Sequence, residues 1–140
     1  MQEFELHPRL ASDTFQVGDF SLCRVLLMND SRYPWLVLVP RLKGVREIHQ
    51  LSEKDRYQLM DESCIVSEWM TQKFPIDKMN VAAIGNLVPQ LHVHHVGRRQ
   101  DDPAWPAPVW GHSDPEPYSH EVLQRLLTDI GNGLGLFKKD

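Results

Sequence analysis

The chain has 140 residues, of which 41% are hydrophobic and 24% are charged. This length fits one domain spanning residues 1–140, and this composition is that of a globular rather than a disordered protein. The formal net charge of −4 disfavours a general nucleic-acid-binding protein, because that class needs a basic surface. A chain of this size can also fold without a disulfide or a structural metal.

The cysteine content and the N-terminus indicate the compartment. Cys23 and Cys64 are too few for a disulfide scaffold, so we predict that both are reduced core residues. The N-terminus lacks a basic segment followed by an apolar run. No apolar stretch reaches the roughly 18 residues that a membrane-spanning helix needs. We therefore expect a cytoplasmic protein without a membrane partner.

We predict a short lead-in and then three strands within the first forty residues. Residues 2–11 form a short helical or irregular lead-in, with Pro8 in a first turn. Two apolar, β-branched runs, at residues 14–17 and 20–28, are separated by Gly-Asp, which predicts a hairpin. Turn-forming residues then precede an apolar run at residues 35–39, which predicts a buried strand.

The clearest helix is predicted at residues 52–73, after a basic loop. Ser52 and Asp55 resemble a capping box at its start, and Pro75 stops it. Apolar side chains at helical spacing predict the face that packs on the core. These side chains are Tyr57, Met60, Cys64, Ile65 and Trp69.

The second half predicts two more strands and a final helix. Residues 78–84 and 88–97 are predicted as antiparallel strands joined by a turn at Gly-Asn. Residues 101–118 contain five of the ten prolines and two of the four tryptophans, so we predict a loop there. Residues 119–131 predict a helix that Ser119 caps, with glycines at its end. The expected fold is α+β, with an antiparallel sheet of about five strands, one long helix and a C-terminal helix.

The chemically active side chains concentrate at residues 90–95, which read Gln-Leu-His-Val-His-His. On a strand, Gln90, His92 and His94 share one face, and His95 points the other way. The Cα atoms of His92 and His94 would lie about 6.8 Å apart. Both imidazoles could then reach one phosphate or one metal ion. A lone His-x-His pair is weak by itself, so the flanking sequence matters.

That flanking sequence resembles the histidine triad (HIT) family of nucleotide-binding proteins. The family motif is His-φ-His-φ-His-φ-φ, where φ is apolar, after a Gly-Gln-x-Val-x lead. Residues 85–89 stand for the lead, and Gln90, His92 and His94 occupy the three histidine positions. The resemblance covers residues 18–100. The Trp- and Pro-rich residues 102–111 are similar to a bacterial branch often described as diadenosine tetraphosphate hydrolases, which also tends to carry Gln in the first position.

The resemblance implies a role for each position. His92, in the middle, would attack the α-phosphate and form a nucleotidyl-histidine intermediate, with the carbonyl of the first position holding its other ring nitrogen. His94 would donate to a phosphate oxygen. Gln90 could hydrogen-bond the leaving group or a phosphate, but its amide cannot act as a general acid. Asn86 is the implied phosphate contact and Asn29 the implied ribose contact.

The resemblance also implies partners. The substrate would be a dinucleoside polyphosphate or another nucleotidyl conjugate, with an adenine nucleotide favoured, and no metal or other cofactor is required. The chain would form a homodimer in which the loop at residues 101–118 reaches the partner's site.

Other interpretations remain open at this point. Because Gln90 replaces a histidine, the chain could be a nucleotide-binding or interaction protein with little turnover. A metal site could use His92, His94 and either His95 or His112, although no carboxylate or thiol lies at a convincing spacing. We expect His95 to be structural or on the surface.

Two further groups of residues allow two interpretations each. Trp105 and Trp110 could stack on a base or anchor their loop. Arg98 and Arg99 could be solvated or could contact phosphate.

Overall fold

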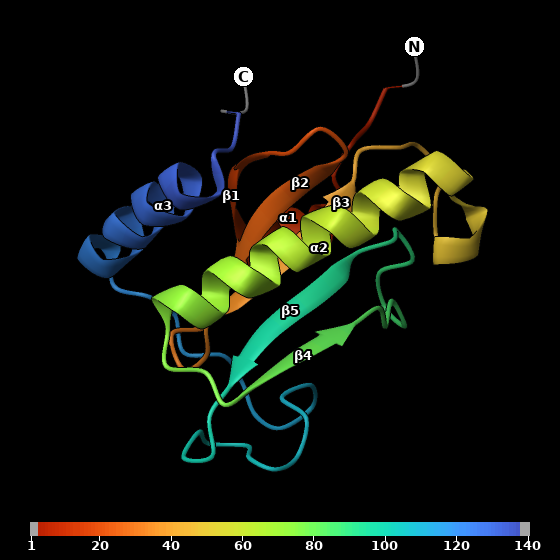
Figure 1. Ribbon diagram of the computed structural model, residues 1–140. Helices are drawn as coiled ribbons and strands as arrows, with labels where there is room; N and C mark the ends of the chain where they lie inside the picture. Colours follow the sequence, from red (N-terminus) through yellow and green to blue (C-terminus); the bar gives the residue numbers. More distant parts are fainter. Residues whose placement is uncertain (1–2, 138–140) are drawn as a thin grey trace.

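The computed structural model describes residues 3–137, and it confirms the predicted α+β fold. Five antiparallel strands form one sheet in the order β1-β2-β3-β5-β4. The long helix α2 crosses one face of this sheet, and α1 lies on the other (Figure 1). The elements are α1 (Pro8–Asp13), β1 (Thr14–Asp19), β2 (Cys23–Met28), β3 (Trp35–Pro40), η1 (Ile48–Gln50), α2 (Glu53–Lys73), β4 (Lys78–Ala82), β5 (Val93–Arg98) and α3 (His120–Leu134). None of the helices within residues 3–137 is long and apolar enough to cross a membrane.

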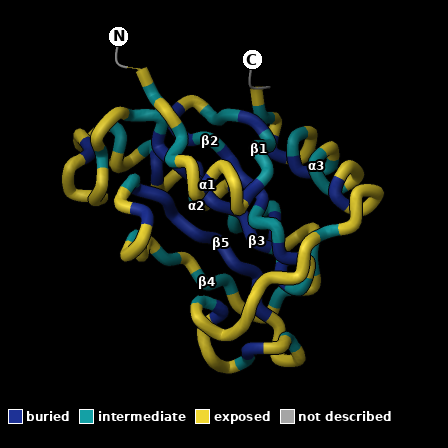
Figure 2. Tube along the Cα trace, turned by 180° about the vertical axis from the view of Figure 1, so that it is seen from behind, coloured by how far each residue is buried: buried dark blue, intermediate teal, exposed yellow. Residues whose placement is uncertain are grey.

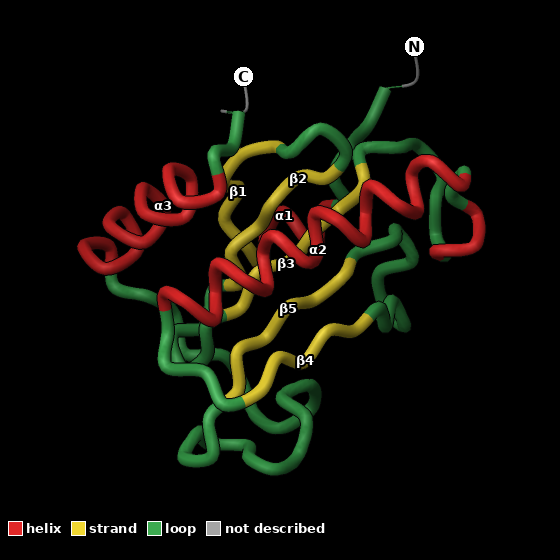
Figure 3. Tube along the Cα trace, in the orientation of Figure 1, coloured by secondary structure: helices red, strands yellow, loops and turns green. Residues whose placement is uncertain are grey.

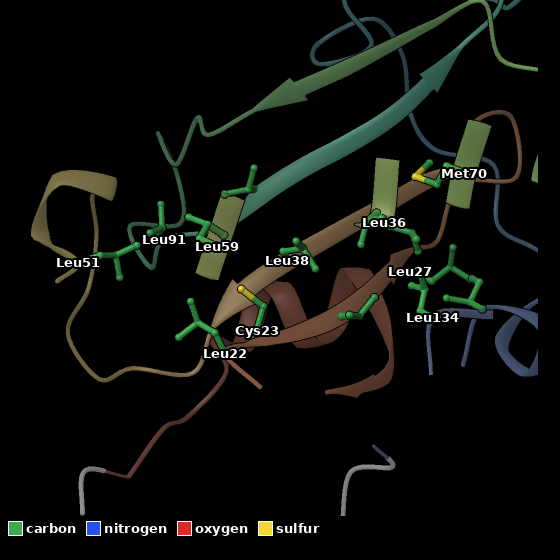
Figure 4. Close-up of a cluster of buried hydrophobic side chains, with 14 of the residues drawn as sticks. Leu22, Cys23, Leu27, Leu36, Leu38, Leu51, Leu59, Met70, Leu91 and Leu134 are labelled. Carbon is green, nitrogen blue, oxygen red and sulfur yellow. The ribbon is translucent and has the colours of Figure 1, made fainter. Parts of the chain in front are cut away.

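The sheet has a hydrophobic cluster on each face. Strand side chains alternate, so Leu36 and Leu38 of β3 face α2, while Val37 and Val39 face α1. All residues of β3 and β5 are buried because both faces of these central strands are covered. Figure 4 shows the α2 side of the core, and Figure 2 shows that β5 is buried along its whole length.

The ends of α2 were predicted correctly, but its buried face was not. The hydroxyl of Ser52 accepts a hydrogen bond from the backbone N–H of Asp55, and the helix ends at Lys73. Tyr57 is 66% exposed and Met60 is 63% exposed, so most of the predicted apolar face points to solvent, whereas Trp69 is half-buried against the core. The buried side chains of α2 are Leu59, Glu62, Val66 and Met70.

Glu62 explains this error. Its carboxylate is 1% exposed and accepts hydrogen bonds from the backbone N–H groups of Leu22 (3.0 Å) and Cys23 (2.8 Å). A carboxylate can be buried when such donors satisfy it, but a pattern of apolar residues counts it as solvent-facing. The prediction that Cys64 lies in the core is wrong for the same reason, whereas Cys23 is buried, and both thiols are free.

Two predicted strand boundaries are also wrong. Strand β1 continues through Gly18 and Asp19, so the chain reverses at residues 20–22. Strand β4 ends at Ala82 and β5 begins at Val93, which leaves residues 83–92 as a loop. Gly85 has a φ of +65°, which extended backbone does not adopt, and Pro89 has no N–H to donate. Gln90 and His92 therefore lie on this loop and not on a strand.

The C-terminal part follows the prediction more closely. Residues 101–118 form a long loop without helix or strand, seen in green in Figure 3. Ser119 caps α3, as predicted. The helix nevertheless continues past Gly131 and ends at Leu134. Gly135, whose φ is +62°, caps it. Gly133 lies against the indole of Trp69, and a Cβ there would collide with it.

Candidate active site

His92 ends the loop before β5 and holds a defined tautomer. Its Nδ1 lies 2.7 Å from the backbone carbonyl oxygen of Gln90. Because a carbonyl oxygen only accepts, Nδ1 carries the proton and donates it. In the neutral ring, Nε2 then keeps a lone pair. His92 is 6% exposed, so the residue as a whole is buried.

His94 lies on β5, and its ring lies 4.9 Å from that of His92 between centroids. The indole N–H of Trp35 donates to Nδ1 of His94 over 3.0 Å. Burial, together with the smaller effects of the nearby His92 and His95, lowers the pKa of His94 to about 3. The ring is therefore neutral at pH 7. With Nδ1 accepting, its single proton sits on Nε2.

His95 points to the other face of the sheet, under α2, as expected for a structural residue. It is fully buried. Its Nδ1 donates to the carbonyl oxygen of Val93 (3.1 Å), and its Nε2 accepts from the hydroxyl of Ser63 (2.7 Å). Burial lowers the pKa of His95 to about 4, so this ring is also neutral. Both nitrogens are occupied, which leaves none for a substrate.

The side chain of Gln90 binds the N-terminal segment. Its Oε1 accepts from the backbone N–H of His7, and its Nε2 donates to the carbonyl oxygen of Glu5, both over 2.9 Å. The amide thus fastens residues 5–7 to the loop that carries His92. It also borders the small cavity beside that histidine.

The cavity beside His92 is small in this structure. It measures about 20 Å³, which is room for one water molecule. Residues 46–47, 83–85 and 90–92 line it.

A second, larger cavity lies beside the two tryptophans that contact His94. It measures about 410 Å³, and Asn29, Trp35 and Trp110 are among the residues that line it. Both indoles also contact His94, with ring centroids 5.7 Å (Trp35) and 5.3 Å (Trp110) from the imidazole. The structure thus places the predicted ribose contact Asn29 in a different cavity from His92.

The two predicted asparagine contacts lie in different surroundings. The Asn29 side-chain oxygen accepts from the backbone N–H of Tyr118 over 3.0 Å, which ties the end of β2 to the segment before α3. Asn86 is exposed on the loop of residues 83–92, next to Gly85, which lines the small cavity.

The Trp-rich loop packs on its own chain. Trp110 lies against His94, whereas Trp105 lies over the guanidinium of Arg98 at 5.6 Å from the ring centroid. Of the two tryptophans, Trp110 is therefore at the histidines, and Trp105 anchors the loop. The expectation that this loop reaches a partner's site stays a prediction.

Arg98 and Asp102 hold this loop. Arg98 is 2% exposed and donates to both carboxylate oxygens of Asp102, at 2.7 and 3.0 Å. Burial alone would raise the pKa of Asp102, but hydrogen bonds from Arg98 and from the N–H groups of Arg99 and Trp105 lower it to about 2. Arg98 is thus structural rather than a phosphate contact. Arg99 is exposed and pairs with Asp101.

The third ligand named for a metal site does not join His92 and His94 in the structure. Within residues 3–137 there is no group of three or more His, Cys, Asp or Glu side chains that could hold a metal ion. His95 is turned to the opposite face of the sheet, and His112 is exposed beside Ser113.

Sequence reasoning missed Trp35 as a site residue. The residue was predicted only as part of a buried strand. Its contact with His94 depends on the pairing of β3 with β5, in which Val37 lies opposite His94. The sequence of residues 35–39 alone does not predict this contact.

Comparison with known proteins agrees with this geometry. A family model described as the HIT domain matches residues 9–101. A histidine triad protein from Marinobacter aquaeolei VT8 is 50% identical, with 96% of this chain and 98% of that chain covered and a TM-score of 0.93. No curated protein matches the chain significantly.

Two further solved structures are similar over nearly the whole chain. A histidine triad protein from Bradyrhizobium japonicum is 43% identical, with 95% of this chain and 99% of that one covered and a TM-score of 0.92. One from Sinorhizobium meliloti 1021 is 38% identical, with 93% and 96% covered and a TM-score of 0.90. HIT proteins bind nucleotides and are generally nucleotide hydrolases or transferases. We conclude from the family model and from these similar structures that this chain belongs to the histidine triad family.

Proposed function

We propose that the chain hydrolyses dinucleoside polyphosphates or related nucleotidyl conjugates at the α-phosphate, with His92 as the nucleophile. The hydrogen bond from His92 Nδ1 to the Gln90 carbonyl oxygen carries this proposal. It leaves a lone pair on Nε2, which is what an attacking imidazole needs. His94 offers an Nε2–H beside it, suited to a phosphate oxygen.

The reaction has two displacements. In the first, His92 Nε2 forms a bond to the α-phosphorus while the bond to the leaving group breaks, and the Nε2–H of His94 stabilises the charge on a non-bridging oxygen. In the second, water attacks the phosphorus and releases a proton to solvent, the P–N bond breaks, and the mononucleotide leaves with neutral His92 restored. Gln90 remains the proposed contact to the leaving group or to a phosphate, from its place at the cavity.

The leaving group is best a phosphate. His94 is neutral at pH 7, because its pKa is about 3, so it has no imidazolium proton to give. The amide of Gln90 cannot supply a proton either. A polyphosphate leaves as an anion without protonation, whereas an amine needs a proton. This chemistry favours dinucleoside polyphosphates, as in the diadenosine tetraphosphate hydrolase-like branch, over phosphoramidates.

We propose that the nucleoside uses the larger cavity, and that Trp110 and its loop move aside so that the α-phosphate reaches His92. At about 410 Å³ it falls in the usual range for small-molecule sites, and Asn29 lines it as the proposed ribose contact. An adenine base could stack on the indoles that line it. Asn86 is the proposed phosphate contact, because the loop that carries it borders the cavity at His92.

The test is a substrate panel. We would incubate the protein with diadenosine polyphosphates of different lengths and with adenosine phosphoramidate, with and without EDTA, and follow AMP release by chromatography. We expect faster release from the polyphosphates, unaffected by EDTA. His92→Ala should abolish release while circular dichroism shows a folded protein. Wild-type rates in that variant would remove the covalent mechanism, and loss of activity with EDTA would point to a metal.

A second candidate is a nucleotide-binding protein with little turnover. The engagement of the Gln90 amide with residues 5–7 favours it, because this side chain occupies the first position of the motif yet is already bonded elsewhere. Calorimetric binding of AMP without hydrolysis of any member of the panel would support this candidate over the hydrolase.

We also propose a homodimer, because apolar side chains of α2 face solvent. Tyr57, Met60 and Ile65 are 66%, 63% and 47% exposed, and Val81 on the edge strand β4 is 50% exposed. Exposed apolar side chains mark interfaces where they gather into a patch. Light scattering should give the mass of a dimer for the natural chain and of a monomer for Met60→Glu. A cytoplasmic location, consistent with two free thiols, is likewise proposed.

A further inference from the structure

The hydrogen bond between Trp35 and His94 assigns a role to a residue outside the histidine motif. We infer that Trp35 is a positioning residue that fixes His94 in the tautomer with its proton on Nε2, aimed at the substrate. The indole Nε1 lies 3.0 Å from Nδ1 of His94. This inference rests on the proposed function for its catalytic consequence, but the tautomer itself can be measured without any substrate.

The chemistry of the two groups makes the bond one-directional. An indole N–H donates and has no lone pair to accept with. If the His94 proton moved to Nδ1, two N–H groups would face each other and both would lose their partner. The proton is therefore held on Nε2, where His94 acts as a donor. With the opposite tautomer, His94 would present a lone pair to a phosphate oxygen and would repel it.

The fold keeps the indole in place. Trp35 is the first residue of β3 and is 8% exposed. In the β3–β5 pairing, Val37 lies opposite His94, so Trp35 is the diagonal neighbour of His94 on the same face of the sheet. Its ring makes edge-to-face contacts with Tyr33 (6.4 Å between centroids) and Trp110 (6.1 Å). A side chain packed on these sides cannot turn its N–H toward another acceptor.

The neighbouring Trp110 supplies a matched control. Its ring contacts His94 at 5.3 Å between centroids, about as closely as that of Trp35 does. Its Nε1 is buried and has no hydrogen-bond partner within residues 3–137. Replacement of either tryptophan by phenylalanine removes one aromatic N–H next to His94. Only the Trp35→Phe change removes an N–H that is bonded to the imidazole.

The experiment uses ¹⁵N NMR of the full chain with labelled histidines. In the natural protein we expect the His94 Nδ1 signal at the position of an unprotonated nitrogen and the Nε2 signal at that of a protonated one. In Trp35→Phe the two signals should move toward each other as the tautomers mix. In Trp110→Phe they should stay in place. A protonated Nδ1 in the natural protein would overturn the inference even if Trp35→Phe does not fold.

Kinetics separates this inference from the proposed function. If the chain hydrolyses a dinucleoside polyphosphate, Trp35→Phe should lower kcat about tenfold with little change in KM, because substrate binding is retained and the donor is lost part of the time. Unchanged signals and unchanged kcat in Trp35→Phe would refute the positioning role and leave the hydrolase standing. A shifted tautomer without any hydrolysis by the natural chain would refute the hydrolase and leave the positioning role standing.

Discussion

His94 and His95 are neighbours on β5, and they differ in one respect that matters for chemistry. Both are buried, at 6% and 0% exposure, and both have lowered pKa values, of about 3 and about 4. The two ring nitrogens of His95 are bonded to Ser63 and to the Val93 carbonyl. His94 has a partner only at Nδ1 within residues 3–137. Spare hydrogen-bonding capacity, and not burial or charge state, therefore separates the site residue from the structural one.

Acid should affect the two histidines alike, and this is the largest effect we expect. Each folded-state pKa lies below the usual value near 6.5, so between about pH 6.5 and pH 4 the unfolded chain binds more protons than the folded one. Stability is fully present above pH 6.5 and falls as the pH falls. Between pH 7 and pH 5 the free energy of unfolding falls by about 2 kcal/mol for each of the two histidines.

Urea unfolding at pH 7, 6 and 5 measures this loss. His94→Gln and His95→Gln should each remove about half of the pH dependence. Asp102 does not interfere, because its contribution is lost only as the pH falls from its ordinary pKa of 3.8 to its folded-state pKa of about 2. A stability that stays constant down to pH 5 would mean that at least one of the two rings takes up a proton in the folded state.

Removal of the structural histidine should cost the most stability of any single change in this pair. His95→Ala leaves a cavity under α2 and takes the partners from Ser63 and the Val93 carbonyl. We expect a loss of about 3 kcal/mol in the free energy of unfolding at pH 7. Activity per folded molecule should change little. The measurement is urea unfolding followed by circular dichroism, with turnover assayed well below the transition.

Removal of the site histidine should have the opposite profile. His94→Ala deletes the Nε2–H donor, and we expect turnover to fall about 100-fold, equivalent to about 2.7 kcal/mol of transition-state stabilisation. Its loss of stability should be smaller than that of His95→Ala. If His95→Ala proved the more damaging to turnover per folded molecule, the distinction between the two faces of β5 would be wrong.

The features of α2 that the sequence predicts correctly depend on interactions between residues close together in the chain. Ser52 and Pro75 mark the ends of α2 because capping and the missing proline N–H act within one turn. The buried face of α2 could not be predicted, because the donors that satisfy Glu62 are 39 and 40 residues away. An apolar pattern records the side chain of a residue but not the partners that the fold brings to it.

The site divides along the same line. The contact of His92 with the Gln90 carbonyl joins residues two positions apart, so a motif can contain it. The contact of His94 with Trp35 spans 59 positions and exists only through the β3–β5 pairing. The Gln90 amide likewise bonds to His7 and Glu5, which are 83 and 85 positions away in the chain. The motif therefore identified the histidines but not the groups that set their protons.

The smallest expected effect tests whether Ser63 matters only through His95. Ser63→Ala removes the hydroxyl that donates to His95 Nε2 over 2.7 Å and leaves a buried lone pair without a donor. We expect a loss of about 1 kcal/mol in the free energy of unfolding and unchanged turnover. Ser67→Ala, one turn along the same helix, controls for the change in helix propensity. In the His95→Ala background the Ser63→Ala change should have almost no cost, because the hydroxyl has lost its acceptor there. An equal cost in both backgrounds would show that Ser63 stabilises the fold without His95.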